Sequence, residues 1–261
     1  MVHPPCPPWE ILLWDSGFFA CRIGRLNGGR LDAALLSAVD AWCREEAIDC
    51  LYFLADAEDP AVARTAEAAG FRLVDLRVTL DREMAALALP PVPDPAPHPT
   101  IRPARPEDLP ALRRIAAASH RDSRFYADPG FDRARCDELY ATWIEESCRG
   151  RMAAAVLVAG DGRDGKDGKD AAGYITCRLE GEVGEIGLLA VDEAARGRRL
   201  GGALVGAGLA WLAAQGAARA RVVTQGRNAR AQRLYQAHGL LTRSIGLWFH
   251  RWAAARGRRE T

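Results

Sequence analysis

The sequence predicts an α+β fold, with a mixed, partly antiparallel sheet flanked by helices and preceded by a smaller α/β domain. Three observations predict it. After residue 100, strand-like and helix-like segments follow one another in mixed order. A proline-rich segment, residues 90–99, separates that part from the residues before it. Residues 18–80 show the order strand, helix, strand, helix, strand with which the chain also ends.

Composition and charge narrow the class of protein. The chain has 261 residues, of which 49% are hydrophobic and 26% charged, as in ordinary globular proteins. A net charge of +1 creates no overall field that would attract nucleic acid or an anionic membrane. No apolar run approaches the length of a membrane span. The seven cysteines form no Cys-x-x-Cys pair and do not cluster with the histidines, so we expect reduced thiols, a cytoplasmic protein and no metal.

The first domain is expected over residues 1–89, followed by a linker at 90–99. Prolines at this density cannot join a helix interior or a central strand, and they favour an extended spacer. In chain order we expect a strand at Phe18–Gly24, a helix at Leu31–Ala47, a strand at Asp49–Leu54, a helix at Ala61–Ala69 and a strand at Phe71–Leu80.

The second domain is expected over residues 100–252, with a basic tail at 253–261. A strand begins at Ile101, and a Gly/Asp-rich hairpin loop covers 160–170. Helices are expected at Glu107–Ala118, Arg133–Cys148, Ala203–Ala214 and Arg227–Ala237. Strands are expected at Ala154–Ala159, Ala172–Leu179, Glu185–Val191, Ala220–Thr224 and Ser244–Trp252, and a polar and aromatic loop at Ser119–Phe131.

The two parts of the chain align with each other at a constant offset. From Arg30 to Leu80 no gap is needed, and Trp42 aligns with Trp211 (211 − 42 = 169). Gly70 aligns with Gly239 at the same offset. Alanine-rich sequences match by chance, so the tryptophan and glycine pairs carry the comparison. We therefore expect the first domain to be a truncated copy of the last part of the second.

An Arg- and Gly-rich turn is the strongest functional signal. It lies between the apolar strand at Glu185–Val191 and a helix. Glycines let backbone N–H groups approach an anion closely, and the helix N-terminus adds its dipole. A simple helix-capping turn rarely contains three arginines among three glycines, so we interpret the turn as a phosphate-binding loop. Its candidate residues are Arg196, Gly197, Arg198, Arg199, Leu200, Gly201, Gly202 and Ala203.

This loop resembles the pyrophosphate loop of the GNAT superfamily of N-acetyltransferases, written Gln/Arg-x-x-Gly-x-Gly/Ala. The register from Arg198 to Ala203 matches every position, and the register from Arg196 places Arg199 where the family has glycine. The resemblance implies that the anion is the diphosphate of acetyl-CoA, which is then the acetyl donor.

The internal repeat suggests which part of the chain binds the donor. Gly201 aligns with Asp32 at the offset of the repeat. A carboxylate at that position would lie where the resemblance places the pyrophosphate. We therefore expect a non-catalytic first domain and donor binding by the second domain alone.

A second motif lies in the helix near the chain end. Asn228 and Tyr235 are seven residues apart, about two helical turns, so both side chains lie near one face. The segment Asn228–Leu240 also resembles the GNAT superfamily, although Leu240 stands where the family usually has phenylalanine. The resemblance implies that Asn228 bonds the pantetheine arm and that Tyr235 protonates the leaving sulfur as general acid. Taken alone, Tyr235 could equally be a half-buried helix aromatic.

The strand before the loop completes the expected donor site. The resemblance implies that a backbone N–H among Leu189, Ala190 and Val191 stabilises the oxyanion and that the strand pairs with pantetheine. Glu185 stands where many family members carry a catalytic base. Alternation puts Glu185 and Leu189 on one face, but the sequence leaves open which face that is. A surface glutamate or proton loss through water is an equally good interpretation.

Further segments resemble the bacterial dTDP-fucosamine acetyltransferases of this superfamily. They include Asp122–Tyr126, Leu139–Glu145 and Trp248–Arg251. The resemblance implies transfer to a dTDP-4-amino-4,6-dideoxyhexose in cell-surface polysaccharide biosynthesis. Arginines suit a diphosphate, and aromatic rings suit a base or a sugar face. We expect the acceptor at Arg121, Ser123, Arg124, Phe125, Tyr126 and Gln225; core packing of the two aromatic residues and helix capping by Gln225 are the alternatives.

Other functions remain open at this stage. The acceptor could be another small amine or a protein N-terminus, which an open groove would favour. A non-catalytic acetyl-CoA sensor is possible, although Asn228 and Tyr235 argue against it. No nucleic-acid-binding motif is present. The resemblance offers a homodimer as one candidate assembly.

Overall fold

The computed structural model describes residues 8–84, 100–160 and 171–253. The expected linker, most of the 160–170 loop and all but the first residue of the basic tail lie outside the described residues. The strands are β1 (Trp9–Ile11), β2 (Ile23–Leu26), β3 (Cys50–Asp56), β4 (Arg72–Glu83), β5 (Ile101–Pro103), β6 (Ala155–Gly160), β7 (Ala171–Glu180), β8 (Val183–Val191), β9 (Arg219–Gln225) and β10 (Leu241–Trp252). The helices are α1 (Leu13–Phe19), α2 (Ala33–Glu45), α3 (Pro60–Ala68), α4 (Leu109–Ala118), α5 (Arg124–Ala127), α6 (Arg133–Cys148), α7 (Leu200–Ala214) and α8 (Ala229–Gln236), with short 3₁₀ helices η1 (Pro106–Asp108) and η2 (Glu193–Ala195).

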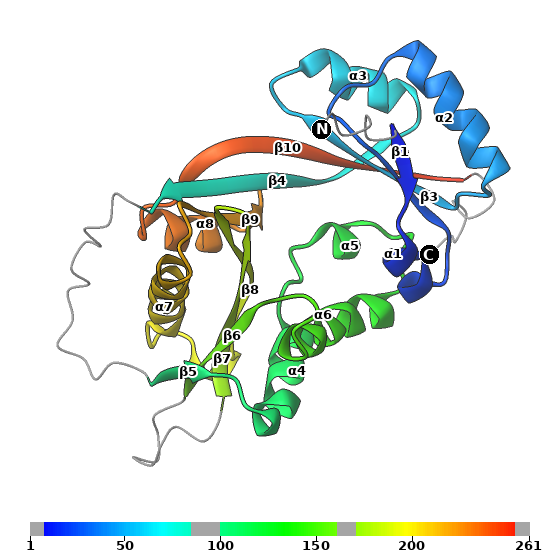
Figure 1. Cartoon of the computed structure of the whole chain (residues 1–261). Coiled ribbons are helices and arrows are strands. Elements are labelled where there is room, and N and C mark those ends of the chain that lie inside the picture. The colour runs from blue at the N-terminus through cyan, green and yellow to red at the C-terminus, as the bar shows by residue number, and fades with distance from the viewer. Residues whose placement is uncertain (1–7, 85–99, 161–170, 254–261) are drawn as a thin grey trace.

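All strands of the described residues form one ten-stranded sheet, in the order β1-β2-β3-β10-β4-β9-β8-β7-β6-β5. The pairs β2–β3 and β8–β9 are parallel, and the other pairs are antiparallel. The predicted mixed, partly antiparallel sheet is therefore confirmed. Figure 1 shows β4 and β10 as two long neighbouring strands that connect the two parts of the molecule. The expected division at 1–89 and 100–252 stays a prediction, and its two parts share this sheet.

A structural repeat relates the first copy, β2 to β4, to the second copy, β8 to β10. At the offset found in the sequence, β3 falls on β9 end to end (219 − 50 = 169) and β4 falls on β10. The ladders repeat as well: Gly246 pairs with Asp56, and Arg77 pairs with Gln225 at the related position. Each copy places its last strand against the other copy, so β4 and β10 are exchanged between them.

Three predicted boundaries change in the structure. The strand expected at Phe18–Gly24 is wrong in its first half, because α1 occupies Leu13–Phe19 and Phe18 and Phe19 pack against a helical core cluster. Ala20, with φ of 51°, ends α1 in the left-handed conformation. The helix expected from Ala203 begins at Leu200, so Gly201 and Gly202 of the Arg/Gly loop lie in its first turn. The loop before α6 contains the one-turn helix α5.

Apolar side chains form separate clusters on the two faces of the sheet. On one face, α7 packs through Leu204 and Leu209 against Ile175 and Val222. On the opposite face, α4 and α6 pack with residues of both parts of the chain, including Tyr52 of β3. A third cluster packs α2 and α3 against the strands of the first copy. Because the second cluster includes Tyr52, the first part of the chain reaches the region beside α5 and α6.

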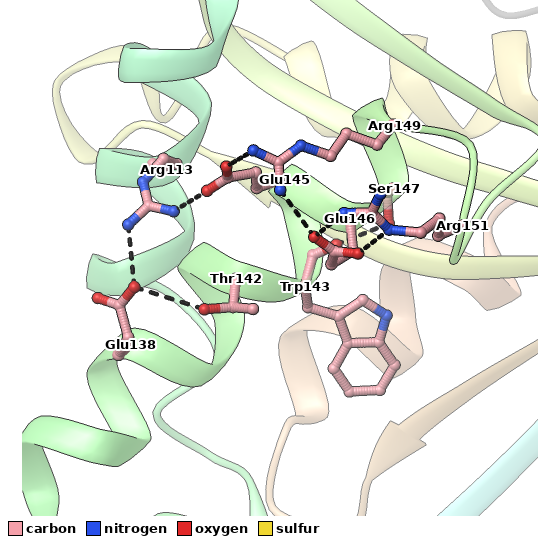
Figure 2. Close-up of polar contacts among 9 residues, drawn as sticks. All are labelled: Arg113, Glu138, Thr142, Trp143, Glu145, Glu146, Ser147, Arg149 and Arg151. Atoms are coloured by element: carbon pink, nitrogen blue, oxygen red, sulfur yellow. Dashed lines mark hydrogen bonds and ion pairs between the residues drawn. The ribbon is translucent and has the colours of Figure 1, made fainter. Parts of the chain in front are cut away.

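A chain of ion pairs joins α4 to α6 at the surface (Figure 2). Arg113 donates to Glu138 at 2.9 Å and to Glu145, and Arg149 bridges Glu145 and Glu146. Exposed pairs of this kind contribute about 0–1 kcal/mol each, so they orient α6 more than they stabilise it. In Figure 2, Trp143 of α6 points away from these pairs.

Candidate active site

The sheet opens between its two parallel strands in the second copy. β8 pairs with β9 only from Val183 to Ile186, and β8 then continues to Val191 without that partner. In the first copy β2 ends at Leu26, and it is paired with β3 over its whole length. A cavity of about 1390 Å³ lies along the opening in the second copy. We refer to it below as the cavity.

Backbone hydrogen bonds show which groups of β8 point into the opening. Leu188 and Asp192 donate their N–H groups toward β7, at 2.8 Å in both cases, to Thr176 Oγ1 and to the Ala172 carbonyl. Successive residues of a strand point their N–H groups in opposite directions. The backbone groups of Leu189 and Val191 therefore point toward the opening, and that of Ala190 points toward β7. All three residues line the cavity.

A bulge shapes β8 at the point where the strands separate. The β7–β8 register shifts between Ile175 and Cys177. A Cβ atom at Gly187 would lie 2.8 Å from Thr176 Oγ1, so the close approach of the two strands requires a glycine there. The bulge also changes which side chains face each helix layer: Ile186 lies in the cluster of α7, and Leu188 lies in the cluster of α4 and α6.

The Arg/Gly loop lies at one end of the cavity. Gly197 has a φ of 81°, which favours glycine, and Arg199 precedes α7 without capping it through its side chain. The first N–H groups of a helix have no partner within the helix, so an anion can bind them. Six predicted loop residues line the cavity, namely Arg196, Gly197, Arg199, Leu200, Gly201 and Gly202. Arg198 and Ala203, predicted with them, do not line it.

The corresponding helix start in the first copy is arranged differently. Asp32 caps α2, and its Oδ1 accepts the Leu35 N–H at 2.8 Å. The carboxylate of Asp32 therefore accepts one of the first backbone N–H groups of α2. The corresponding residues in the first turn of α7 are Gly201 and Gly202, which carry no such side chain. The Asp32 carboxylate would also repel a second anion. These contacts disfavour phosphate binding at α2.

Tyr235 and Asn228 both line the cavity from α8. Tyr235 is 5% exposed, and burial raises the pKa of its phenol above the usual range, which keeps the proton in place for donation. Asn228 is the N-cap of α8, and its Oδ1 accepts the Ala231 N–H at 3.0 Å. Its side-chain oxygen is therefore engaged, and the amide NH₂ is the group left for a ligand.

Glu185, the expected base, does not line the cavity. Its Oε2 accepts hydrogen bonds from Nε and Nη2 of Arg178 at 2.8 and 2.5 Å. Arg178 is its cross-strand partner on β7 and does line the cavity. The structure thus places the arginine, rather than the glutamate, toward a ligand.

The first part of the Ser119–Phe131 loop also lines the cavity. Ser123, Arg124 and Phe125 line it, as does Gln225 at the end of β9. The guanidinium carbon of Arg124 lies 4.3 Å from the ring centroids of both Phe125 and Trp248 and 5.0 Å from that of Tyr52. Phe125 is also a core residue, 4% exposed, so it packs the loop and faces the cavity at once.

The other two predicted acceptor residues do not line the cavity. Tyr126 donates its hydroxyl to Asp137 at 2.6 Å, and burial together with this bond raises the pKa of the phenol. Arg121 is exposed to solvent. For Tyr126, the structure favours the alternative that the ring holds the loop against α6.

Residues of β4 line the cavity, and the sequence analysis missed them. Asp75 is 6% exposed, and burial raises the pKa of its carboxyl from 3.8 to about 6. Its Oδ1 accepts the Leu76 N–H at 2.8 Å, and Arg227 lies 3.9 Å away. Arg77 lines the cavity beside it. The alternation of Asp75, Arg77 and Thr79 with apolar residues over the stretch 73–80 was the available signal that one face of this strand meets a polar site.

The described residues contain neither a membrane-spanning helix nor a metal cluster. Within residues 8–84, 100–160 and 171–253, no helix is long and apolar enough to span a membrane. In the same residues, no group of three or more histidine, cysteine, aspartate or glutamate side chains could hold a metal ion.

Part of the chain is similar to known proteins. Residues 125–240 match the model of the acetyltransferase (GNAT) family. The chain is 34% identical over 149 residues to the dTDP-fucosamine acetyltransferase of Escherichia coli O6:H1 strain CFT073, covering 55% of this chain and 59% of the relative. It is 25% identical to the spore coat polysaccharide biosynthesis protein SpsD of Bacillus subtilis strain 168, covering 58% and 50%. The alignments thus span less than two thirds of either relative.

A solved structure has the same arrangement over most of the chain. It is a tandem GNAT protein from the clavulanic acid biosynthesis pathway, with a TM-score of 0.59 and 15% identity. The match covers 91% of this chain and 76% of that one. At this identity the likeness concerns the fold alone, and it agrees with the internal repeat.

Proposed function

We propose that the chain is a GNAT acetyltransferase that transfers acetyl from acetyl-CoA to the amino group of a nucleotide-linked amino-deoxysugar. The acceptor class is a dTDP-4-amino-4,6-dideoxyhexose. One observation carries the donor half of the proposal: the unpaired part of β8 beyond Ile186, the Arg/Gly loop and the buried Tyr235 line a single cavity. The relative that acts on dTDP-fucosamine supports the acceptor class.

The residues around the opening supply each part of an acetyl transfer. The N–H groups at the start of α7 bind the diphosphate of the donor, with Arg196 and Arg199 beside them. The free edge of β8 pairs with the pantetheine arm as a neighbouring strand would. An N–H group of Leu189 or Val191 stabilises the negative charge on the carbonyl oxygen under attack. Tyr235 donates its proton to the sulfur as the carbon–sulfur bond breaks.

The acceptor amine must lose a proton, and Asp75 is the group proposed to take it. A base works best when its pKa lies near the working pH, and a carboxyl with a pKa of about 6 is better matched than one of ordinary acidity. Glu185 is bound by Arg178 and does not line the cavity. Asp75 replaces it as the candidate base, from the first part of the chain.

A thiol-release assay tests the proposal. Purified protein is incubated with acetyl-CoA and a panel of dTDP-, UDP- and GDP-linked amino sugars, together with polyamines and an N-terminal peptide. We expect thiol release with nucleotide-linked 4-amino sugars and none with the other amines. Release with a polyamine or peptide would assign a different acceptor. Tight acetyl-CoA binding without release from any acceptor would indicate a sensor.

A further inference from the structure

Two arginines that line the cavity beside α5 and β4, where we place the acceptor, have no bonded counter-ion. Arg77 comes from β4 and Arg124 from α5, and both line the cavity. In the part of the chain that the structure describes, no hydrogen bond or ion pair joins either guanidinium to another residue. The Arg124 Nε is buried and has no partner among those residues. Buried arginine donors without acceptors are rare, because their desolvation is costly.

The surroundings of Arg77 are predominantly positive. The positive charges of Arg25, Arg124 and Arg221 repel that of Arg77. The carboxylate of Glu185 attracts it. Burial, and after it the charges of these arginines, lower the pKa of Arg77. Glu185 is already bound by Arg178 at 2.5 Å, and Arg25 is paired with Glu10 at 2.6 Å.

The carboxylates near Arg124 do not neutralise this charge by direct contact. Asp15 and Asp75 interact electrostatically with Arg124 but form no ion pair with it. Its guanidinium carbon lies over the rings of Phe125 and Trp248, which supply no negative charge to pair with it. Two cations that interact with each other and have no bonded counter-ion fit an anion that carries more than one charge.

We propose that Arg77, together with Arg124, binds the diphosphate of the nucleotide-linked acceptor. The identity of the ligand rests on the proposed function. The position of the site rests on the two guanidinium groups that have no bonded counter-ion. Arg77 pairs across the strands with Gln225, a predicted acceptor contact, which places the site at the end of β9 beside the opening. The strand exchange brings Arg77 of the first copy next to α5, so the first part of the chain takes part in acceptor binding.

Titration calorimetry with dTDP tests the site in the full-length protein saturated with CoA. Arg77→Gln should weaken dTDP binding about 10- to 100-fold, because charge-assisted hydrogen bonds to phosphate are lost. Arg77→Lys should recover part of the affinity through its charge but not the two-pronged contact. Arg243→Gln is the matched control, because it removes an exposed arginine of β10 that pairs with Asp81 of β4. This variant should bind dTDP like the wild type.

Kinetics separate the failure of this inference from that of the proposed function. Arg77→Gln should raise the acceptor KM by a similar factor, with the KM of acetyl-CoA unchanged and the melting temperature not lowered. Turnover of a nucleotide amino sugar with an unaltered KM would overturn the site and leave the function standing. Arg77-dependent dTDP binding without acetylation of any nucleotide amino sugar would support the site and overturn the acceptor. A loss of acetyl-CoA affinity in Arg77→Gln, or no dTDP binding by the wild type, would overturn the site.

Discussion

Asp75→Asn should stabilise the protein at neutral pH while reducing its activity. The folded state raises the carboxyl pKa from 3.8 to about 6, because burial disfavours the charged form. At 1.36 kcal/mol per pKa unit, ionised Asp75 destabilises the fold by about 3 kcal/mol. The carboxamide has no charge to bury, and its oxygen can still accept the Leu76 N–H.

The sign of the pH dependence follows from the raised pKa. Between pH 3.8 and about 6 the folded carboxyl retains a proton that the unfolded chain has lost, so wild-type stability falls as the pH rises through this window. The gap between variant and wild type should therefore be near zero at about pH 3 and reach about 3 kcal/mol above pH 7. Urea unfolding at several pH values measures it. Asp56→Asn, an exposed aspartate on β3, should change stability by no more than about 0.5 kcal/mol.

The same variant tests the proton acceptor. Wild-type kcat/KM should fall below pH 6 as Asp75 becomes protonated, and this limb should be absent in Asp75→Asn. The rate above pH 7 should fall about 10²- to 10⁴-fold, the usual contribution of general base catalysis. Equal stability at pH 7 would refute the burial argument, and an unchanged rate would remove Asp75 as the base.

Three further predictions follow from the donor side. Tyr235→Phe keeps the ring in the core but removes the phenolic proton. Thiol release should therefore slow about 10²- to 10⁴-fold with unchanged acetyl-CoA affinity. A variant that turns over as fast as the wild type would exclude Tyr235 as the acid. Gly201→Asp copies the Asp32 cap of the first copy, and calorimetry should show acetyl-CoA binding weakened by roughly tenfold or more; undiminished binding would contradict a phosphate at this helix start. Thr176→Val removes the acceptor of the Leu188 N–H, so urea unfolding should show a loss of about 1–3 kcal/mol; no loss would mean that this N–H finds another acceptor.

The residues of the proposed donor site were the part most accessible from the sequence. A run of arginines and glycines, and an Asn and a Tyr two turns apart on one helix, are local patterns with a direct chemical meaning. Helix and strand boundaries were less accessible. Phe18 and Phe19 suggested a strand, yet they belong to a helix whose aromatic rings pack on a distant core cluster. Such packing depends on partners far away in the chain.

The sequence alone determined the α+β class, the repeat at constant offset and the position of the Arg/Gly loop. These follow from local periodicity and from residue types that suit an anion. Only the tertiary structure decided that β4 lies between β9 and β10, and therefore that Asp75 and Arg77 reach the cavity. Backbone hydrogen bonds between strands are nearly independent of side-chain identity, so the alternating pattern of β4 shows which residues share a face but not which strand lies beside them. The exchange of β4 and β10 settles that choice and places the first part of the chain beside α5, where we propose that the acceptor binds.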